Sequence, residues 1–237
     1  MASLFENQTG ALGLKSYIKK LGLHHSLKGI RFDLLRMKAR IGLRSKYRRI
    51  SKMATIEKLH LGCGKRKVSG WLNMDITNSD LNIDFSEAKL PFPDKSVKYI
   101  VSQHMIEHLY YYEEFIPLIS EMARVLEDNG EVWLSCPDLE KVVVSYQNYK
   151  CTDLISDKLE RFPDAFIPEP SQHFINILFH QEGSHKNLYD FDMLEYAAIK
   201  GGFSNVERVD EKEFLLNFPE FPKRGDDHQS IYVRISK

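Results

Sequence analysis

The sequence predicts an α/β domain with a seven-stranded, mostly parallel sheet and helices on both of its faces. From residue 53 onward, short apolar segments alternate with amphipathic ones, which is the pattern of strands joined by covering helices. Seven of the apolar segments have the length of buried strands, and a glycine turn follows the first of them. The chain has 237 residues, enough for one such domain with appendages.

A basic helical arm is expected at residues 1–52, ahead of the domain at residues 53–237. The arm carries 13 Lys and Arg and only two acidic residues, so its net charge is +11 and that of the remainder is −11. Apolar residues recur in the arm at helical spacing, which predicts two helices with a break near residues 22–26. The first interpretation is a solvated helical extension packed on the domain. The charge also suggests an anionic partner, for which a membrane surface is the alternative and nucleic acid is disfavoured.

The strands of the domain are predicted from apolar runs that Gly, Asp or Pro residues end. They are expected at residues 58–61, 71–76, 81–85, 98–103, 131–136, 206–210 and 230–235. The clearest helix spans residues 113–126, because its apolar side chains fall on one face and residues 128–130 stop it. Further helices are expected near residues 139–146 and 192–200.

The segment 141–185 is expected to be an insertion over the active site. From residue 151 its periodicity is weak and it contains two closely spaced prolines, so a loosely ordered loop is an equal alternative. The segment also contains His173, His180 and His185. Metal ligands, acceptor contacts and ordinary loop histidines are all compatible with these three residues.

A cofactor site is predicted from three elements that follow one another along the chain. The first strand runs into a turn at residues 62–64 whose glycines let a ligand approach the backbone closely. Asp75 ends the second strand, where a carboxylate can accept both hydroxyl protons of a ribose. Asp84 follows the third strand, and the apolar stretch 90–97 comes next, a combination that suits an adenine.

The spacing between these elements is short. Only 11 positions separate Gly64 from Asp75. A helical crossover between parallel strands usually needs a dozen residues or more, so the first helix is expected to be reduced to a turn.

Four stretches of the chain together resemble the class I SAM-dependent methyltransferases, which have a Rossmann-like fold. They are residues 58–76, 90–109, 121–140 and 185–207. The narrower resemblance is to a bacterial group associated with polysaccharide biosynthesis, which shares the shortened first helix. It implies S-adenosyl-L-methionine (SAM) as the cofactor. One departure is His60, which stands where these enzymes often have an acidic residue.

The resemblance also implies which residues contact the cofactor. They are Leu61, Gly62, Cys63, Gly64, Asp75, Ile76, Asp84, Phe85, Gln103 and His104. The glycines would admit the methionine part of SAM, Asp75 would hold the ribose, and Asp84 with Phe85 would frame the adenine. The last two residues of the set would line the methyl-donor end.

The catalytic residues are expected in the segment that follows the fourth strand. His108 is the first candidate for a general base, because a hydroxyl acceptor needs a base with a pKa near neutrality. His104 is the second candidate, and Glu107 is expected to orient one of the two. These residues also match H-x-x-E-H, a zinc-hydrolase motif that requires a helix. The strand-like run before His104 disfavours that helix, so no metal is expected.

The acceptor is expected to contact His185, Tyr189 and Tyr111. The predicted reaction is O-methylation of a sugar, a glycolipid or a related small metabolite in cell-surface polysaccharide biosynthesis. A nucleic-acid methyltransferase that uses the basic arm is one alternative, and a non-catalytic scaffold with the SAM fold is another.

The expected location is the cytoplasm. Cys63, Cys136 and Cys151 are widely spaced, with no CxxC pair and no evident secretory signal peptide. No apolar stretch approaches the roughly 18–20 residues that cross a bilayer. A peripheral position at the inner face of the membrane, with residues 1–52 on anionic lipid, is the alternative.

Overall fold

The computed structural model describes residues 24–52 and 55–237. It separates into two units at residues 41 and 42, so helix α2 (His24–Arg40) belongs to one unit and residues 42–237 form the other, called the core unit below. The helix expected before residue 22 lies outside the described residues. Among the helices in the described ranges, none has the length and apolar character needed to cross a membrane.

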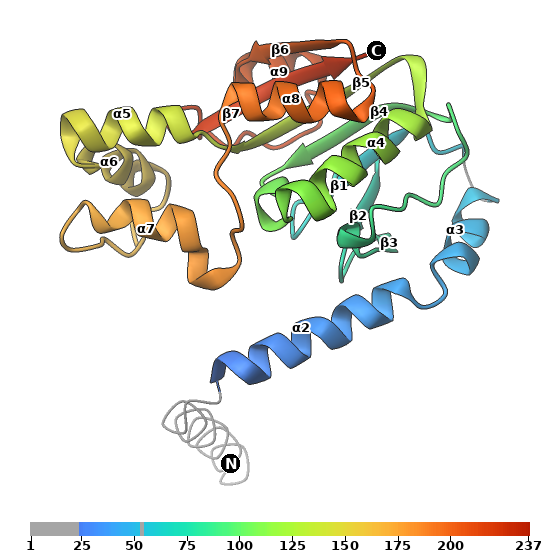
Figure 1. Ribbon diagram of the computed structural model, residues 1–237, viewed down its shortest axis with the longest axis horizontal. Helices are drawn as coiled ribbons and strands as arrows, with labels where there is room; N and C mark the ends of the chain where they lie inside the picture. Colours follow the sequence, from blue (N-terminus) through green and yellow to red (C-terminus); the bar gives the residue numbers. More distant parts are fainter. Residues whose placement is uncertain (1–23, 53–54) are drawn as a thin grey trace, which may run out of the picture. The chain divides into compact units, whose positions relative to one another are not determined.

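The core unit contains one seven-stranded sheet with the order β3-β2-β1-β4-β5-β7-β6 (Figure 1). Its strands are β1 (Lys58–Leu61), β2 (Leu72–Asp75), β3 (Leu81–Asn82), β4 (Val97–Gln103), β5 (Leu126–Pro137), β6 (Asn205–Val209) and β7 (Ser230–Ser236). Strands β1 to β5 pair in parallel, and β7 is antiparallel to both of its neighbours. The predicted Rossmann-like fold class is therefore confirmed.

The strand order reverses where β1 lies beside β4. In open α/β sheets, ligands bind outside the carboxyl ends of the strands at such a reversal. The turn at residues 62–64 follows β1, and the segment from His104 to His108 follows β4. Both sequence motifs therefore lie at the place where this fold accepts ligands.

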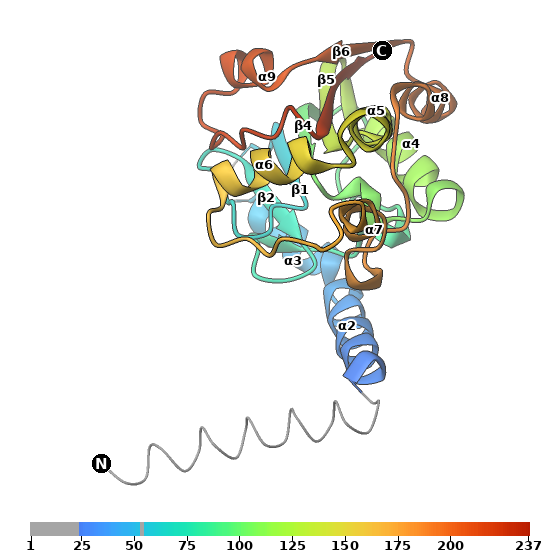
Figure 2. The same ribbon diagram turned by 90° about the vertical axis from the view of Figure 1, so that its left-hand side faces the viewer.

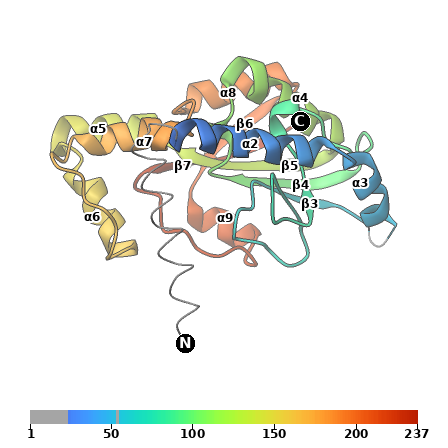
Figure 3. The same ribbon diagram turned by 90° about the horizontal axis from the view of Figure 1, so that it is seen from below.

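Helices surround the sheet on both faces and at one end. The α-helices of the core unit are α3 (Leu43–Ser51), α4 (Ile116–Val125), α5 (Leu139–Tyr149), α6 (Thr152–Arg161), α7 (His173–His180), α8 (Phe191–Gly201) and α9 (Glu211–Asn217). Helices α4 and α8 lie on one face and α9 on the other (Figure 3). Helices α5, α6 and α7 lie beyond the carboxyl ends of the parallel strands (Figure 1), where they can cover a site.

Alternation along the strands divides the core between these faces. Ile100 packs in the larger apolar cluster under α4 and α8, whereas its neighbour Val101 packs in an aromatic cluster with Trp133 and Phe214. Successive strand residues point to opposite faces, so a buried sheet needs apolar residues on both. This explains why the central strands read as unbroken apolar runs.

The described part of the basic arm differs from the expectation. Gly42, with a φ of 72°, separates α2 from α3, so the helix expected to run to the basic cluster is interrupted there. The apolar residues of α3 pack on the large cluster of the core unit, and the Tyr47 ring meets the Phe92 ring at 5.0 Å. Helix α3 is thus part of the core unit, which begins at residue 42.

Other corrections concern short elements. Strand β3 ends at Asn82, because Asp84 caps a helical turn, η1 (Phe85–Glu87). Residues 151–185 are not a loose loop, since α6 and α7 pack with α5 around a small apolar cluster that contains Leu154 and Phe174. Helix α9 was not expected at all.

Candidate functional site

The turn after β1 is fixed by the neighbouring strand and by the segment after β4. The backbone N–H groups of Gly62 and Cys63 both donate to the carbonyl oxygen of Met74, at 2.8 and 3.1 Å. Gly62 has a φ of 70°, and a Cβ built on it would stand 2.4 Å from the Cβ of Met105. Gly62 is therefore required by this close approach, which places the turn directly beside the segment after β4.

Gly64 and Asp75 form the part of the turn that is open to a ligand. The N–H of Gly64 donates to Oδ2 of Asp75 at 2.8 Å, and the N–H of Ile76 donates to Oδ1 at 2.6 Å. Each carboxylate oxygen keeps lone pairs for a further donor. A Cβ built on Gly64 would meet nothing within 4 Å, so this glycine borders open space. The pair has the carboxylate and the room that a ribose requires.

A loop, and not a helix, connects β1 to β2, and the side-chain amide of Asn73 holds this loop in place. Its Oδ1 accepts from the N–H of Val68 at 2.8 Å, and its Nδ2 donates to the carbonyls of Val68 and Trp71 at 3.0 and 3.1 Å. Nδ1 of His60 lies 3.1 Å from the same Oδ1. Burial lowers the pKa of His60 to about 4, so it is a neutral residue that supports the loop. His60 does not replace the acidic group that is often found there.

The other expected cofactor residues are mostly buried. Leu61, Cys63 and Phe85 are at most 7% exposed, so little of their side chains can reach a ligand. Oδ1 of Asp84 accepts from the N–H and the hydroxyl of Ser86, at 3.1 and 2.7 Å, and thereby caps η1. The contacts of these residues with SAM stay predictions.

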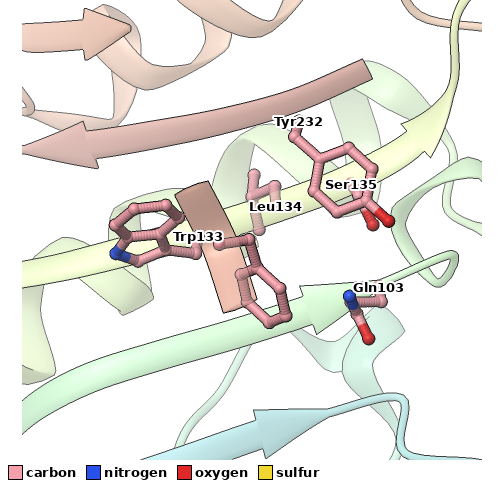
Figure 4. Close-up of a pocket in the computed structure, with 6 residues that line it drawn as sticks. Gln103, Trp133, Leu134, Ser135 and Tyr232 are labelled. Carbon is pink, nitrogen blue, oxygen red and sulfur yellow. The ribbon is translucent and has the colours of Figure 1, made fainter. Parts of the chain in front are cut away.

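Gln103 ends β4 beside a small hollow at the carboxyl end of the sheet. Figure 4 shows its side chain near those of Ser135 and Tyr232, which come from β5 and β7. Gln103 is 7% exposed, and its Nε2 has no hydrogen-bond partner among the described residues. Its expected role at the methyl-donor end also stays a prediction.

His104 lies between two buried carboxylates. Its Nε2 is 2.8 Å from Oδ2 of Asp226, and its Nδ1 is 3.2 Å from Oε1 of Glu107. Asp226 also accepts from the Tyr232 hydroxyl at 2.6 Å and pairs with Arg224 at 2.9 Å. Burial opposes charge on all three groups, but their mutual hydrogen bonds outweigh it. The pKa of His104 is therefore raised, and the pKa values of Glu107 and Asp226 are lowered.

This arrangement corrects the expectation that His104 is a second general base. Both of its ring nitrogens face carboxylate oxygens, and its raised pKa keeps it as an imidazolium. An imidazolium has no lone pair to accept a proton. His104 instead positions Glu107 and Asp226.

Stability is expected to depend on pH through this group. Because the pKa of His104 is raised in the folded state, its protonation stabilises the fold. This stabilisation is complete below pH 6.5, the ordinary histidine pKa, and is lost as the pH rises through the folded-state pKa. The lowered pKa values of Glu107 and Asp226 mean that their ionised forms stabilise the fold. This stabilisation is complete above the ordinary pKa values of 4.5 and 3.8 and is lost on acidification. Urea unfolding should therefore give the largest free energy between about pH 4.5 and 6.5. In His104→Gln the decline above pH 6.5 should flatten; an unchanged decline would contradict this assignment.

His108 and His185 lie next to each other, and each uses its Nδ1 in a hydrogen bond to a backbone carbonyl. Nδ1 of His108 lies 3.1 Å from the carbonyl oxygen of Ser184, and Nδ1 of His185 lies 2.6 Å from that of Leu178. A carbonyl only accepts, so both Nδ1 atoms are donors and both Nε2 atoms keep a lone pair in the neutral rings. The two rings meet edge to face with centroids 4.8 Å apart. One ligand atom each from Glu107, His108 and His185 lies within 4.8 Å of the others.

Backbone contacts bring His185 to this place from far along the chain. The N–H of Lys186 donates to the carbonyl of Glu107 at 2.8 Å, and Nδ2 of Asn187 donates to that of Leu109 at 2.6 Å. The short turn η2 (Ile106–His108) is thereby tied to the segment before α8. The H-x-x-E-H motif thus lies on a strand end and a turn, as predicted, and not on an α-helix.

Two of the expected acceptor contacts make structural hydrogen bonds. Tyr189 is 0% exposed, and its hydroxyl donates to the carbonyl of Ile106 at 3.2 Å. The Tyr111 hydroxyl donates to the carbonyl of Met193 at 2.7 Å, and burial raises its pKa to about 12. Both hydroxyl groups are engaged with the backbone, so any contact of these two residues with an acceptor stays a prediction. Of the three, His185 alone reaches the site.

A pocket of about 270 Å³ lies between η2 and the helices α6 and α7. Figure 2 views the molecule from the side of these helices, which stand in front of the strand ends. The pocket is lined by His104, Glu107, His108, Pro137, Lys158, Arg161, Phe162, Phe174, Ile177, Leu178, Gln181, His185, Arg224 and Gln229. The histidines predicted from the sequence therefore border a real cavity.

Sequence reasoning missed the charged residues that complete this pocket. Lys158 and Arg161 come from α6, while Arg224 comes from the segment before β7 and pairs with the buried Asp226 behind it. Arg161 is paired with Asp157 at 2.6 Å. No local motif links these residues to the histidines, so the sequence carried no signal for them.

Comparison with known proteins gives one family match and several similar folds. The family model described as a methyltransferase domain matches residues 80–134. A SAM-dependent methyltransferase from Archaeoglobus fulgidus is 16% identical, with a TM-score of 0.45 over 90% of this chain and 100% of that one. One from Mesorhizobium loti is 14% identical, with a TM-score of 0.43 over 81% and 97%. Among curated proteins, none matches.

The family match covers β3 to β5 and the segment from His104 to His108, which contains part of the site. The sheet order places the glycine turn and Asp75 at the strand reversal, where a cofactor binds in such folds. The matched part of this chain is thus similar to a methyltransferase domain, and its sheet has the Rossmann-like order.

Proposed function

We propose that this enzyme transfers the methyl group of SAM to a hydroxyl group of a sugar, a glycolipid or a related small metabolite. The observation that carries the proposal is the pair of free Nε2 atoms beside the buried carboxylate of Glu107, on the wall of a cavity. A hydroxyl oxygen must lose its proton to become a methyl ether, so its activation requires such a group. The link to cell-surface polysaccharides rests on the sequence resemblance alone.

The residues at the strand reversal fit SAM. Gly64 borders open space, and Asp75 has a carboxylate with lone pairs left for the ribose hydroxyls. When bound, SAM supplies an electrophilic methyl group on a sulfonium. Because Met105 abuts Gly62, the cofactor turn and the pocket of His108 are neighbours, as transfer in line between two bound molecules requires.

The lining of the pocket suits a sugar. Phe162 offers apolar surface for the C–H face of a ring, and Gln181 and Gln229 offer amide groups for its hydroxyls. Lys158 lies over the Phe174 ring at 5.4 Å, which places a cation at the same wall. Residues of α6 and α7, among them Lys158 and Ile177, form one wall of the pocket.

The test is a transfer assay with deuterated-methyl SAM and a panel of sugars, nucleotide sugars and glycolipids, read by mass spectrometry. The expected product is a methyl ether, and His108→Ala should lower kcat about 10²–10⁴-fold, as the loss of proton-transfer catalysis does. Transfer to RNA, DNA or an amine instead would overturn the choice of acceptor. SAH binding without transfer to any member of the panel would favour the scaffold alternative.

The partner of residues 1–52 remains a separate proposal, in which an anionic membrane surface is favoured over nucleic acid. Within the described residues, helix α3 supports this proposal. Its Arg44, Arg48 and Arg49 are exposed, while its apolar face packs on the core unit. Binding to vesicles that contain anionic lipid should fall when these three arginines are replaced by glutamate. No change would contradict the role of α3.

A further inference from the structure

The cluster of Glu107, His108 and His185 has the composition of a metal site. Two imidazoles and one carboxylate are a common protein ligand set for catalytic zinc and for iron(II), and they leave positions open for a further ligand. The three ligand atoms lie within 4.8 Å of one another. Ligands about 2.1 Å from one ion stand roughly 3–4 Å apart. Side-chain shifts of about 1 Å would therefore close this set around an ion.

The hydrogen bonds of the two imidazoles orient them as ligands. Metal-binding histidines usually donate their second ring N–H to a carbonyl or carboxylate, which fixes the tautomer and the ring orientation. His108 donates to Ser184 and His185 donates to Leu178 in this way, both through Nδ1. Each ring therefore keeps the lone pair of its Nε2 for a ligand.

The carboxylate of Glu107 provides the independent observation. It is 1% exposed and lines the cavity, yet its Oε2 has no hydrogen-bond partner among the described residues. An ionised carboxylate left without a partner in a protein interior is costly, and such groups are normally paired or bound to metal. Oε1 faces His104, so that imidazolium holds the carboxylate while Oε2 stays free.

We propose that Glu107, His108 and His185 bind one divalent metal ion of the zinc, manganese or iron(II) class. This departs from the expectation, drawn from the sequence, that the site holds no metal. Glu107 and His108 belong to the H-x-x-E-H motif, whereas His185 comes from the segment before α8. His104 is paired with Asp226 and serves to orient Glu107.

The role of the ion rests on the proposed function, whereas its binding does not. A hydroxyl oxygen bound to a divalent ion loses its proton at a lower pH, because the ion stabilises the alkoxide. The proton passes to solvent, the oxygen forms a bond to the methyl carbon, and the methyl–sulfur bond breaks to release the thioether. With the ion bound, His108 would help to activate the hydroxyl through the ion that it holds, so His108→Ala is still expected to lower kcat.

The test is a titration of chelator-treated full-length protein with Co²⁺, followed by its visible d–d absorption and by calorimetry. The wild type is expected to bind one Co²⁺ per chain. His108→Ala and His185→Ala should each weaken binding by more than about 100-fold, since loss of even an outer partner costs about 10–100-fold. The control is His180→Ala, an exposed histidine outside the cluster, which should bind as the wild type does.

Circular dichroism verifies that each variant is folded, and Glu107→Gln provides a substitution of similar shape that should also weaken binding. A folded wild-type protein that binds no Co²⁺ would overturn the proposal, as would binding that both histidine variants retain. SAH binding and methyl-ether formation are measured on the same samples. Metal binding without ether formation refutes the acceptor alone, and ether formation that a chelator leaves unchanged refutes the ion's role.

Discussion

Asp226→Asn is expected to lower the free energy of unfolding by roughly 3–5 kcal/mol, the cost of breaking a buried ion pair from one side. The Asp226 carboxylate is 1% exposed and contacts His104, Arg224 and the hydroxyl of Tyr232. Asparagine keeps the shape but not the charge, so His104 and Arg224 would both lose their ion pair with residue 226. Urea unfolding at pH 6 measures the effect.

The matched control is Asp128→Asn, because Asp128 forms an exposed pair with Lys95 at 2.8 Å. Exposed pairs contribute at most about 1 kcal/mol. If Asp226→Asn were no more destabilising than this control, His104 would not be held as an imidazolium, and the assignment of its role would fail.

Asp75→Ala is expected to weaken SAH binding roughly 100-fold, or by about 3 kcal/mol, through the loss of charge-assisted hydrogen bonds to the ribose. The carboxylate also accepts from Gly64 and Ile76, so its removal loosens the turn that borders the open space. Calorimetry gives the dissociation constants of wild type and variant. Asp128→Asn again serves as the control, and equal affinities for all three proteins would place the cofactor elsewhere.

The sequence predicted the elements whose signal is local. Strand β1 has the expected bounds because its short apolar run ends directly in a glycine turn. The absence of a first helix between β1 and β2 was predicted because too few residues separate Gly64 from Asp75 for a helical crossover. Helices α6 and α7 were missed, because they are 10 and 8 residues long and few of their positions are buried. Their packing on Val142 of α5 exists only in the folded chain.

Only the site residues that lie in one short segment of the sequence could be predicted. His108 and Glu107 were found because they follow β4 within a recognisable motif. Their partners depend on folding: His185 arrives through backbone bonds to η2, and Asp226 lies 122 positions from His104. Tyr189 was assigned to the acceptor because it lies near His185 in the sequence. Its ring instead fills the core, with the Phe115 ring 5.4 Å away.

We propose that the turn at residues 62–64 and Asp75 form the binding site for SAM. A calorimetric titration of the purified chain with SAH tests this most directly, since SAH needs no acceptor to bind. Saturable binding of one SAH per chain is expected. A folded protein that shows no binding of SAH or SAM would contradict it.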